Sequence, residues 1–185
     1  SFVDPFGLSS KRGQGPTELE AAYMAKHIYH YNEENPVELI GGWVFETEKL
    51  VVGGDGMVMG VYSRDDGNGN VEYTLVNRGT VSWSLFYSDI YNNLSQPIGL
   101  SNDMKASIQA AENFAKNNPY SRITFVGHSK GGAEAIANAV ATGKDAIVFN
   151  PATAMLSEYG LDADAYEGKI TSYVVEGEIL DGLSV

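Results

Sequence analysis

A buried strand, a glycine-bounded serine and an alanine-rich helix follow one another along this chain, and together they constrain the fold more than any other feature. Residues 122–126 read RITFV, a short apolar run typical of a strand that is buried on both faces. Residues 131–142 are rich in alanine and predict a helix that ends at Gly143. The turn between them is GHSKG at 127–131. A strand that turns sharply into a helix is typical of α/β domains with a parallel sheet.

Apolar patterns in the rest of the chain complete a mixed α/β domain. Thr17 and Glu20 have the spacing of a capping box, so we expect a helix that starts at Thr17 and stops before Pro36. Asn and Gly residues at 65–70 predict the turn of a hairpin. The further elements expected are strands between 39 and 77, a helix over 101–117, and buried strands at 145–150 and 170–180. We therefore expect a mostly parallel central sheet flanked by helices, with the N-terminal helix and antiparallel strands at one edge.

Composition excludes several classes of site and partner. The chain has 12 Lys and Arg against 24 Asp and Glu, a formal net charge of −12, which argues against nucleic acid and against anionic membrane faces. Neutral and zwitterionic substrates remain open. The sequence has no Cys, which removes disulfides, thiolate zinc sites and cysteine nucleophiles. We expect no metal and no organic cofactor, no transmembrane segment, and no signal peptide in the first residues.

The turn at 127–131 fits the pattern Gly-x-Ser-x-Gly, with Ser129 at its centre. Such an elbow holds a nucleophile in a strained conformation, and Gly127 and Gly131 leave the space that the tight turn needs. The Ser129 hydroxyl would lie at the carboxyl end of the sheet, near free N–H groups of a helix N-terminus that favour an oxyanion. A turn that uses glycines and a serine without catalysis is the alternative, and the flanking strand and helix favour the nucleophile.

A second signature lies upstream, where residues 76–90 read VNRGTVSWSLFYSDI. Combined with the elbow, its order and spacing resemble the class 3 lipase family of α/β-hydrolases over about residues 17–181. The matching positions are Arg78, Gly79, Thr80, Trp83, Asp89, Pro119 and 127–132. The resemblance implies an α/β-hydrolase-like fold and a serine esterase, a lipase or phospholipase, that hydrolyses acyl esters through an acyl-enzyme.

The resemblance also implies roles for individual residues. The backbone N–H groups of Thr80 and Lys130, the residue after the nucleophile, would form the oxyanion hole. Arg78 and Asp89 are expected to hold the loop by an ion pair rather than to touch substrate. Trp83 is expected to be a packing anchor rather than a substrate platform.

Three features near the elbow complete the expected site. His128 should face away from Ser129 and pack under the elbow. Residues 88–100 fall where class 3 lipases carry a lid, and an ordinary connection packed on the core is the equal alternative. Lys130 stands where the family more often has Leu, so its side chain either is solvated or pairs with a phosphate or carboxylate head group.

A serine nucleophile needs a base and an orienting acid, in the chain order serine, acid, histidine for this fold. Glu178 and Asp181 are the candidates for the acid, and Glu178 fits the register of the family better. No histidine follows them, while His27 and His30 lie far upstream on the first helix, where core or surface roles are expected. We therefore expect the hydrolase domain at 17–185 to be incomplete, with its catalytic histidine beyond the last residue.

The first residues suggest a biological setting. DPFGL at 4–8 resembles the signature that ends the core of RHS-repeat proteins, after which variable toxin domains begin. The resemblance implies that 1–16 is a linker with an RHS-core remnant at 1–8. The domain would then be an antibacterial effector, secreted or delivered by a carrier protein, with an immunity protein as partner. The alternative is a catalytically inactive hydrolase-fold module or fragment that such an immunity protein recognises.

Overall fold

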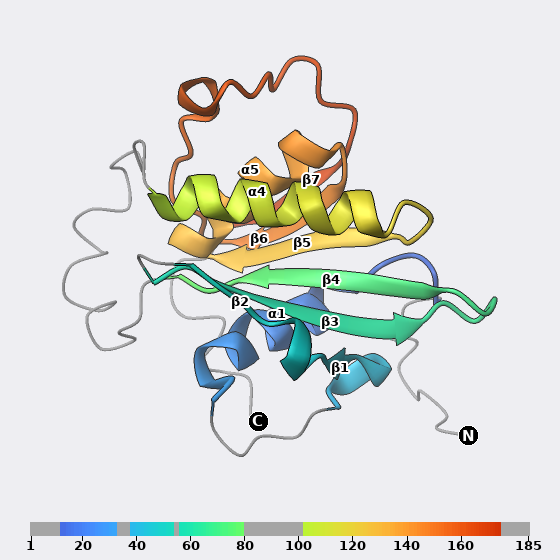
Figure 1. The fold of residues 1–185 in the computed structure, drawn as a ribbon. Helices are drawn as coiled ribbons and strands as arrows, with labels where there is room; N and C mark the ends of the chain where they lie inside the picture. Colours follow the sequence, from blue (N-terminus) through green and yellow to red (C-terminus); the bar gives the residue numbers. More distant parts are fainter. Residues whose placement is uncertain (1–11, 33–37, 54–55, 80–101, 175–185) are drawn as a thin grey trace.

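Four stretches of the chain, residues 12–32, 38–53, 56–79 and 102–174, are described by the computed structural model. They form a seven-stranded sheet with helices on both faces (Figure 1). The helices are α1 (Glu18–His27), α4 (Asn102–Asn117) and α5 (Lys130–Thr142), with short 3-10 turns η1 (Ile28–His30), η2 (Ile40–Gly42), η3 (Thr47–Lys49) and η5 (Leu156–Tyr159). The strands are β1 (Val44–Phe45), β2 (Val51–Val52), β3 (Val58–Asp65), β4 (Val71–Asn77), β5 (Ile123–His128), β6 (Asp145–Phe149) and β7 (Ile170–Tyr173).

The sheet changes from antiparallel to parallel pairing at β4. Its order is β1-β3-β4-β5-β6-β7, with β2 beside β3, and β1, β2 and β4 all run antiparallel to β3. Strands β4 to β7 are parallel to one another. Asn77 lies opposite Gly127, and Gly127 lies opposite Val148, so the carboxyl ends of β4, β5 and β6 share one edge. The predicted fold class is confirmed in its architecture: a mixed α/β domain whose central sheet is flanked by helices, with antiparallel strands at one edge.

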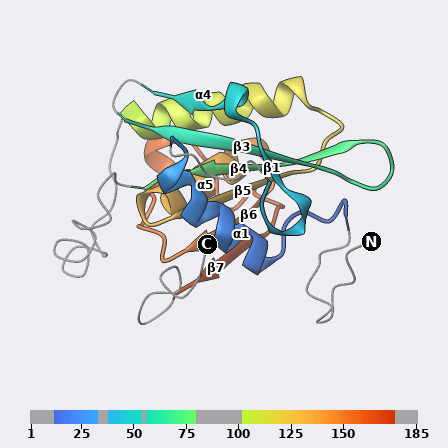
Figure 2. The same ribbon diagram turned by 90° about the horizontal axis from the view of Figure 1, so that it is seen from below.

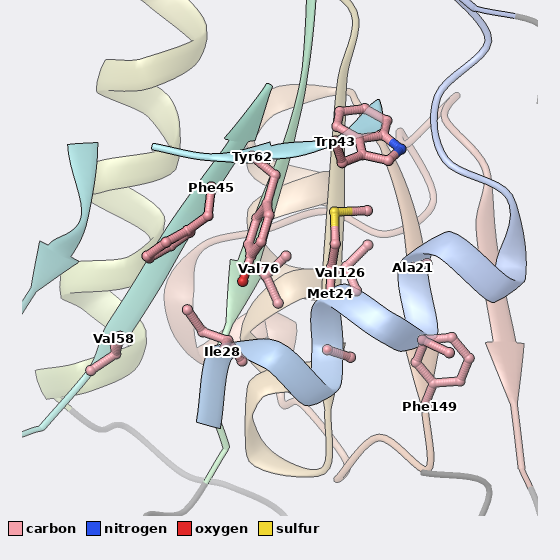
Figure 3. Close-up of a cluster of buried hydrophobic side chains, with 12 residues drawn as sticks. Ala21, Met24, Ile28, Trp43, Phe45, Val58, Tyr62, Val76, Val126 and Phe149 are labelled. Carbon is pink, nitrogen blue, oxygen red and sulfur yellow. The ribbon is translucent and has the colours of Figure 1, made fainter. Parts of the chain in front are cut away.

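Both faces of the sheet are covered, which explains the continuous apolar runs of the central strands. Helix α1 crosses one face and helices α4 and α5 lie on the other (Figures 1 and 2). Val126 faces α1 and packs with Met24 and Phe149, as Figure 3 shows. The preceding residue, Phe125, points to the opposite face and packs with Ala135 of α5. This alternation buries every residue of β5.

The capping box at the start of α1 is present. The backbone N–H of Glu20 donates to the Thr17 hydroxyl at 3.2 Å, and the N–H of Thr17 donates to the Glu20 carboxylate at 3.0 Å. The helix ends at His27 and tightens into η1 rather than continuing as an α-helix. Side chains of Asp66 and Asn70 hold the hairpin turn, since the N–H of Asn70 donates to Asp66 at 3.0 Å.

The segment just before α1 contacts the sheet. The backbone N–H groups of Gly13 and Gly15 donate to the two oxygens of the Glu72 carboxylate at 3.1 and 2.9 Å. Within the described ranges, no helix combines the length and apolar character needed to cross a bilayer. The DPFGL segment at 4–8 lies outside the described residues.

Candidate active site

Ser129 occupies a sharp turn between the end of β5 and the start of α5. Its backbone has φ 55° and ψ −124°, and only one other non-glycine residue in the described ranges, Asn150, has a positive φ. Its N–H donates to the carbonyl of Phe149 on β6 at 3.1 Å, while its own carbonyl accepts the N–H of Ala152 at 3.0 Å. A serine held in this disfavoured region is the conformation that a nucleophile elbow requires, because it lifts the hydroxyl away from the strand.

The three glycines around Ser129 are required by close backbone contacts. A Cβ atom on Gly127 would lie 2.7 Å from the backbone nitrogen of Gly132 and closer still to Gly131. A Cβ on Gly131 would collide with the carbonyl of Asn77 at the end of β4, and one on Gly132 would lie 2.9 Å from the Pro151 side chain. Any larger residue at these positions would push the elbow away from the sheet.

His128 is buried beneath the elbow, next to the 3-10 turn η1. Its Nδ1 atom lies 3.4 Å from the hydroxyl of Tyr29, and the two rings meet edge to face at 6.4 Å. Burial lowers the pKa of His128 to about 4, so the ring is neutral at physiological pH. The imidazole therefore carries no charge next to the nucleophile.

The two upstream histidines lie on α1 and η1. The Nδ1 atom of His27 is 2.8 Å from the hydroxyl of Tyr62, and its ring packs edge to face on Phe45 at 5.1 Å. Burial lowers the pKa of His27. His30 is exposed on η1. His27 thus packs against Phe45 and Tyr62, two aromatic residues of the core cluster beneath α1.

The end of β4 packs directly against the elbow. A Cβ on Gly79 would collide with the hydroxyl of Tyr29 and would lie 2.9 Å from the carbonyl of His128. The N–H of Gly79 hydrogen-bonds the Tyr29 hydroxyl, and burial raises the pKa of that hydroxyl. Thr80, the other predicted oxyanion-hole residue, is the next residue and lies outside the described residues. Gly79, which leads into the predicted oxyanion loop, therefore packs against the elbow.

Arg78 lies beside this contact. Its guanidinium carbon is 5.5 Å from the centre of the Tyr31 ring, and its buried Nε atom has no hydrogen-bond partner among the described residues. The predicted partner Asp89, the predicted anchor Trp83 and the segment 88–100 lie outside the described residues. The Arg78–Asp89 ion pair stays a prediction, as does the choice between a lid and an ordinary connection.

Lys130 is engaged by protein carboxylates. Its Nζ atom forms an ion pair with Asp103 of α4 and lies 3.7 Å from the carboxylate of Glu134, one turn further along α5. The Lys130 side chain is 28% exposed. Neither a freely solvated lysine nor one reserved for a head group describes this arrangement, because its charge is already paired inside the protein.

Glu134 belongs to a buried polar network that joins α5, α4 and β4. Asn77 donates to Glu134 at 3.0 Å and to Ser107 at 2.8 Å, and Asn138 donates to Asn77 at 2.9 Å and to Ser107 at 2.8 Å. Burial raises the pKa of Glu134 to about 7, while Lys130 and Asn77 oppose the shift. One oxygen of Glu134 and one of Asp103 are buried and form no hydrogen bond with any described residue.

The sequence reasoning missed Asp103, Glu134 and the network around them. The spacing of four residues between Lys130 and Glu134 on a helix could have indicated that ion pair. Asp103 gave no comparable signal, because it meets Lys130 only when α4 and α5 pack together. Glu178 and Asp181, the candidate acids, lie outside the described residues. In the described ranges, no three His, Asp or Glu side chains gather as they would around a metal ion.

Comparisons with known proteins agree with the chemistry of an elbow. A family model described as phospholipase-like, Tle-like phospholipase domain, matches residues 20–184. The chain is similar to an extracellular phospholipase A1 of Serratia liquefaciens, at 28% identity over 186 residues, 91% of this chain and 56% of that protein. It thus spans about half the length of this relative. A solved complex of Rhizomucor miehei lipase with its propeptide aligns with a TM-score of 0.47 and 13% identity, covering 85% of this chain and 49% of that one.

Proposed function

Because the chain belongs to the phospholipase-like family through its Tle-like phospholipase domain, we propose that it is the nucleophile-bearing part of a serine phospholipase. The observation that carries the proposal is the backbone of Ser129, with φ 55° and ψ −124° at a glycine-lined junction of β5 and α5. Lipases and phospholipases share ester hydrolysis, and the elbow supplies the group that attacks the ester.

The proposed reaction has two steps. The Ser129 hydroxyl loses its proton to a histidine and attacks the ester carbonyl carbon, and the N–H groups of Thr80 and Lys130 donate to the resulting oxyanion. The C–O bond to the glycerol oxygen breaks, and the histidine returns the proton to that oxygen. Water then hydrolyses the acyl-serine by the same proton transfers in reverse roles. Glu178, or Asp181 in its place, would orient the histidine.

We expect the base to be a histidine other than the three in this sequence. His27 is held against Tyr62 and Phe45, and the Nδ1 atom of His128 lies beside Tyr29. His30 is exposed on η1 and precedes Ser129 in the chain, whereas the histidine of this fold follows the acid. Because the chain spans 56% of the Serratia relative, experiments on activity use the full-length protein.

The proposed substrate is a phospholipid with a neutral or zwitterionic head group. The family description and the name of the Serratia relative support a phospholipid. The net charge of −12 disfavours strongly anionic bilayers, because like charges repel at the membrane surface. Phosphatidylcholine or phosphatidylethanolamine vesicles are accordingly the substrates to test.

The test compares the full-length protein with its Ser129→Ala variant on phosphatidylcholine vesicles. Wild type should release free fatty acid and lysophospholipid, and mass spectrometry of the products should identify the ester that is cut. Ser129→Ala should lower the rate by at least about 1,000-fold, because it removes the nucleophile. Hydrolysis by Ser129→Ala at the wild-type rate would overturn the assignment.

An inactive hydrolase-fold module is the alternative, and a serine-reactive phosphonate separates the two. Covalent labelling at Ser129 requires an activated hydroxyl, so a wild-type protein that stays unlabelled while folded would favour the inactive module. The Ser129→Ala variant serves as the matched control and should remain unlabelled in either case.

We propose further that the enzyme is a secreted or carrier-delivered antibacterial effector, countered by an immunity protein. The RHS-like DPFGL segment and the extracellular Serratia relative support this setting. Directed to the bacterial periplasm, the wild-type protein should stop growth and Ser129→Ala should not. Equal growth of cells with the two proteins would contradict the effector role and leave the esterase assignment intact.

A further inference from the structure

Asp103, Lys130 and Glu134 form a charge cluster directly behind the elbow, which we call the elbow charge cluster. Lys130 Nζ contacts both carboxylates, and the side chains of Asp103 and Glu134 are 8% and 1% exposed. One cation thus faces two buried carboxylates from two different helices. Such a cluster is costly to bury, and replacing Lys130 alone leaves two buried carboxylates without their cation.

The same cluster is connected to the strand that leads into the predicted oxyanion loop. Glu134 accepts from the side chain of Asn77 at 3.0 Å, and Asn77 is the last residue of β4. The carbonyl of Asn77 also packs against Gly131 of the elbow. Glu134 therefore contacts Lys130, which follows the nucleophile, and β4, which leads into Thr80.

We propose that the elbow charge cluster positions the backbone of Lys130, the residue after the nucleophile: Asp103 and Glu134 hold its side chain, and Glu134 ties it through Asn77 to the end of β4. The inference rests on the proposed function, because it assigns a role in the same reaction. Asp103, Glu134 and Asn77 are positioning residues, since they act through the backbone of Lys130.

The charge of Glu134 makes this positioning role depend on pH. The charged groups that act on Glu134 from the described residues are Lys130 of α5 and Asp103 of α4, while β4 contributes the neutral Asn77. Tyr29 of η1 is close enough for Glu134 to raise the pKa of its hydroxyl. With Glu134 protonated, the cluster is neutral. When Glu134 ionises, the cluster gains a negative charge near the place where the oxyanion develops, which disfavours the transition state. The raised pKa of Glu134, about 7, places that change in the working range of a serine hydrolase.

The decisive experiment measures how phosphatidylcholine hydrolysis depends on pH, for the full-length protein and for its Glu134→Gln variant. Wild-type kcat should fall as pH rises above about 7, whereas Glu134→Gln should keep its kcat on the alkaline side and exceed wild type there by about tenfold. KM should stay within about twofold, because the effect concerns the transition state alone. The matched control is Glu112→Gln, which removes an exposed carboxylate from α4 and should retain the wild-type profile.

Two further variants separate positioning from general stability. Lys130→Met should lower kcat by about tenfold with little change in KM, and Lys130→Arg should recover most of that loss by keeping the ion pair with Asp103. Thermal unfolding of each variant identifies any that lose activity by failing to fold. A Lys130→Met loss that appears in KM alone, or a folded Glu134→Gln enzyme with the wild-type pH profile, would overturn the inference. Wild-type protein without ester hydrolysis would instead overturn the proposed function.

Discussion

Two buried charge clusters of the same composition, one cation and two carboxylates, lie near opposite ends of β4. The elbow charge cluster lies beyond its last residue, Asn77. The second, which we call the Arg64 cluster, consists of Glu20, Arg64 and Glu72, and Glu72 is the second residue of β4. The two differ in how completely their polar atoms are paired, and this difference separates a cluster that fixes the fold from one that can serve a reaction.

In the Arg64 cluster, several elements supply hydrogen-bond acceptors to the guanidinium. Arg64 donates to Glu72 at 2.8 Å, to Glu20 at 3.2 Å, and to the carbonyls of Gly41 and Gly15 at 3.0 and 3.2 Å. The guanidinium also stacks over Trp43 at 4.3 Å. The cluster joins β3, β4, α1 and the segment before α1, so its geometry is set by the whole assembly.

The elbow charge cluster is paired less completely. Within the part of the chain that the structure describes, one oxygen of Asp103 and one of Glu134 are buried without a hydrogen bond, although this Glu134 oxygen lies 3.7 Å from Lys130 Nζ. Buried oxygens without a hydrogen bond are costly, and natural proteins retain them where the charge or the proton has a use. Changes in the Arg64 cluster should therefore mainly lower the stability of the fold. The elbow charge cluster should mainly gain or lose a proton.

The largest expected effect is on the Arg64 cluster. Arg64→Met should lower the free energy of unfolding by about 3–5 kcal/mol, because it leaves two buried carboxylates without their cation. Urea unfolding of this chain measures the loss. Lys130→Met should cost about 1–2 kcal/mol, because Glu134 can take up a proton and become neutral.

The matched control for Arg64→Met is the triple variant with Glu20→Gln and Glu72→Gln added. Removing all three charges should recover part of the stability, because the penalty comes from unpaired buried charge. Equal losses for Arg64→Met and Lys130→Met would break the comparison between the clusters.

The second effect concerns acid unfolding through His128, beneath the elbow. Its pKa is lowered to about 4 by burial, so the unfolded chain binds the proton more tightly and stability falls as pH drops from about 6.5 to 4. Between pH ~7.5 and ~4.5 this linkage should cost about 2.5 kcal/mol of unfolding free energy. His128→Asn, which cannot titrate, should lose this share of the pH dependence. If His128→Asn unfolds in acid as wild type does, another group causes the pH dependence of stability.

The third effect has the opposite sign and comes from Glu134. Its pKa is raised to about 7, so its contribution to stability is present below about pH 4.5 and is lost as pH rises through 7. From pH ~5.5 to ~8.5 wild type should lose about 2 kcal/mol that Glu134→Gln does not lose. Unfolding in urea at both pH values measures the difference. Glu20→Gln is the control at the other cluster, and it should destabilise at both pH values because it leaves Arg64 short of a partner.

Much of the fold could be predicted from local sequence signals. The capping box, the hairpin turn at 65–70 and the strand–elbow–helix segment each depend on residues near one another in the chain, and the structure contains all three. Boundaries were less accurate. The first helix was expected to continue until just before Pro36, but the α-helix ends at His27 and tightens into a 3-10 turn. The strand predicted at 170–180 is β7 over Ile170–Tyr173, and residues 175–180 lie outside the described residues.

The two charge clusters could not be predicted, because each needs tertiary contacts. Arg64 and Glu20 are 44 residues apart in the chain, and Lys130 and Asp103 are 27 apart. Isolated charged residues in a sequence suggest exposed positions, so the prediction for Lys130 considered solvent and ligands rather than a partner on α4. The elbow could be located because its glycines and serine are contiguous. What surrounds it depends on how α4 packs on α5.

The smallest expected effect, at Thr17, sharpens the comparison because this residue reaches the Arg64 cluster through Glu20. Thr17→Ala removes the hydroxyl that accepts the Glu20 N–H and should cost about 1 kcal/mol of unfolding free energy, while Thr17→Ser should cost little. Because the N–H of Thr17 also donates to the carboxylate that Arg64 holds, Thr17→Ala and Arg64→Met should be non-additive by at least about 0.5 kcal/mol. Thr17→Ala and Lys130→Met share no partner and should add. Additivity in both pairs would mean that the cap and the Arg64 cluster act separately, and that Glu20 does not link the start of α1 to the sheet.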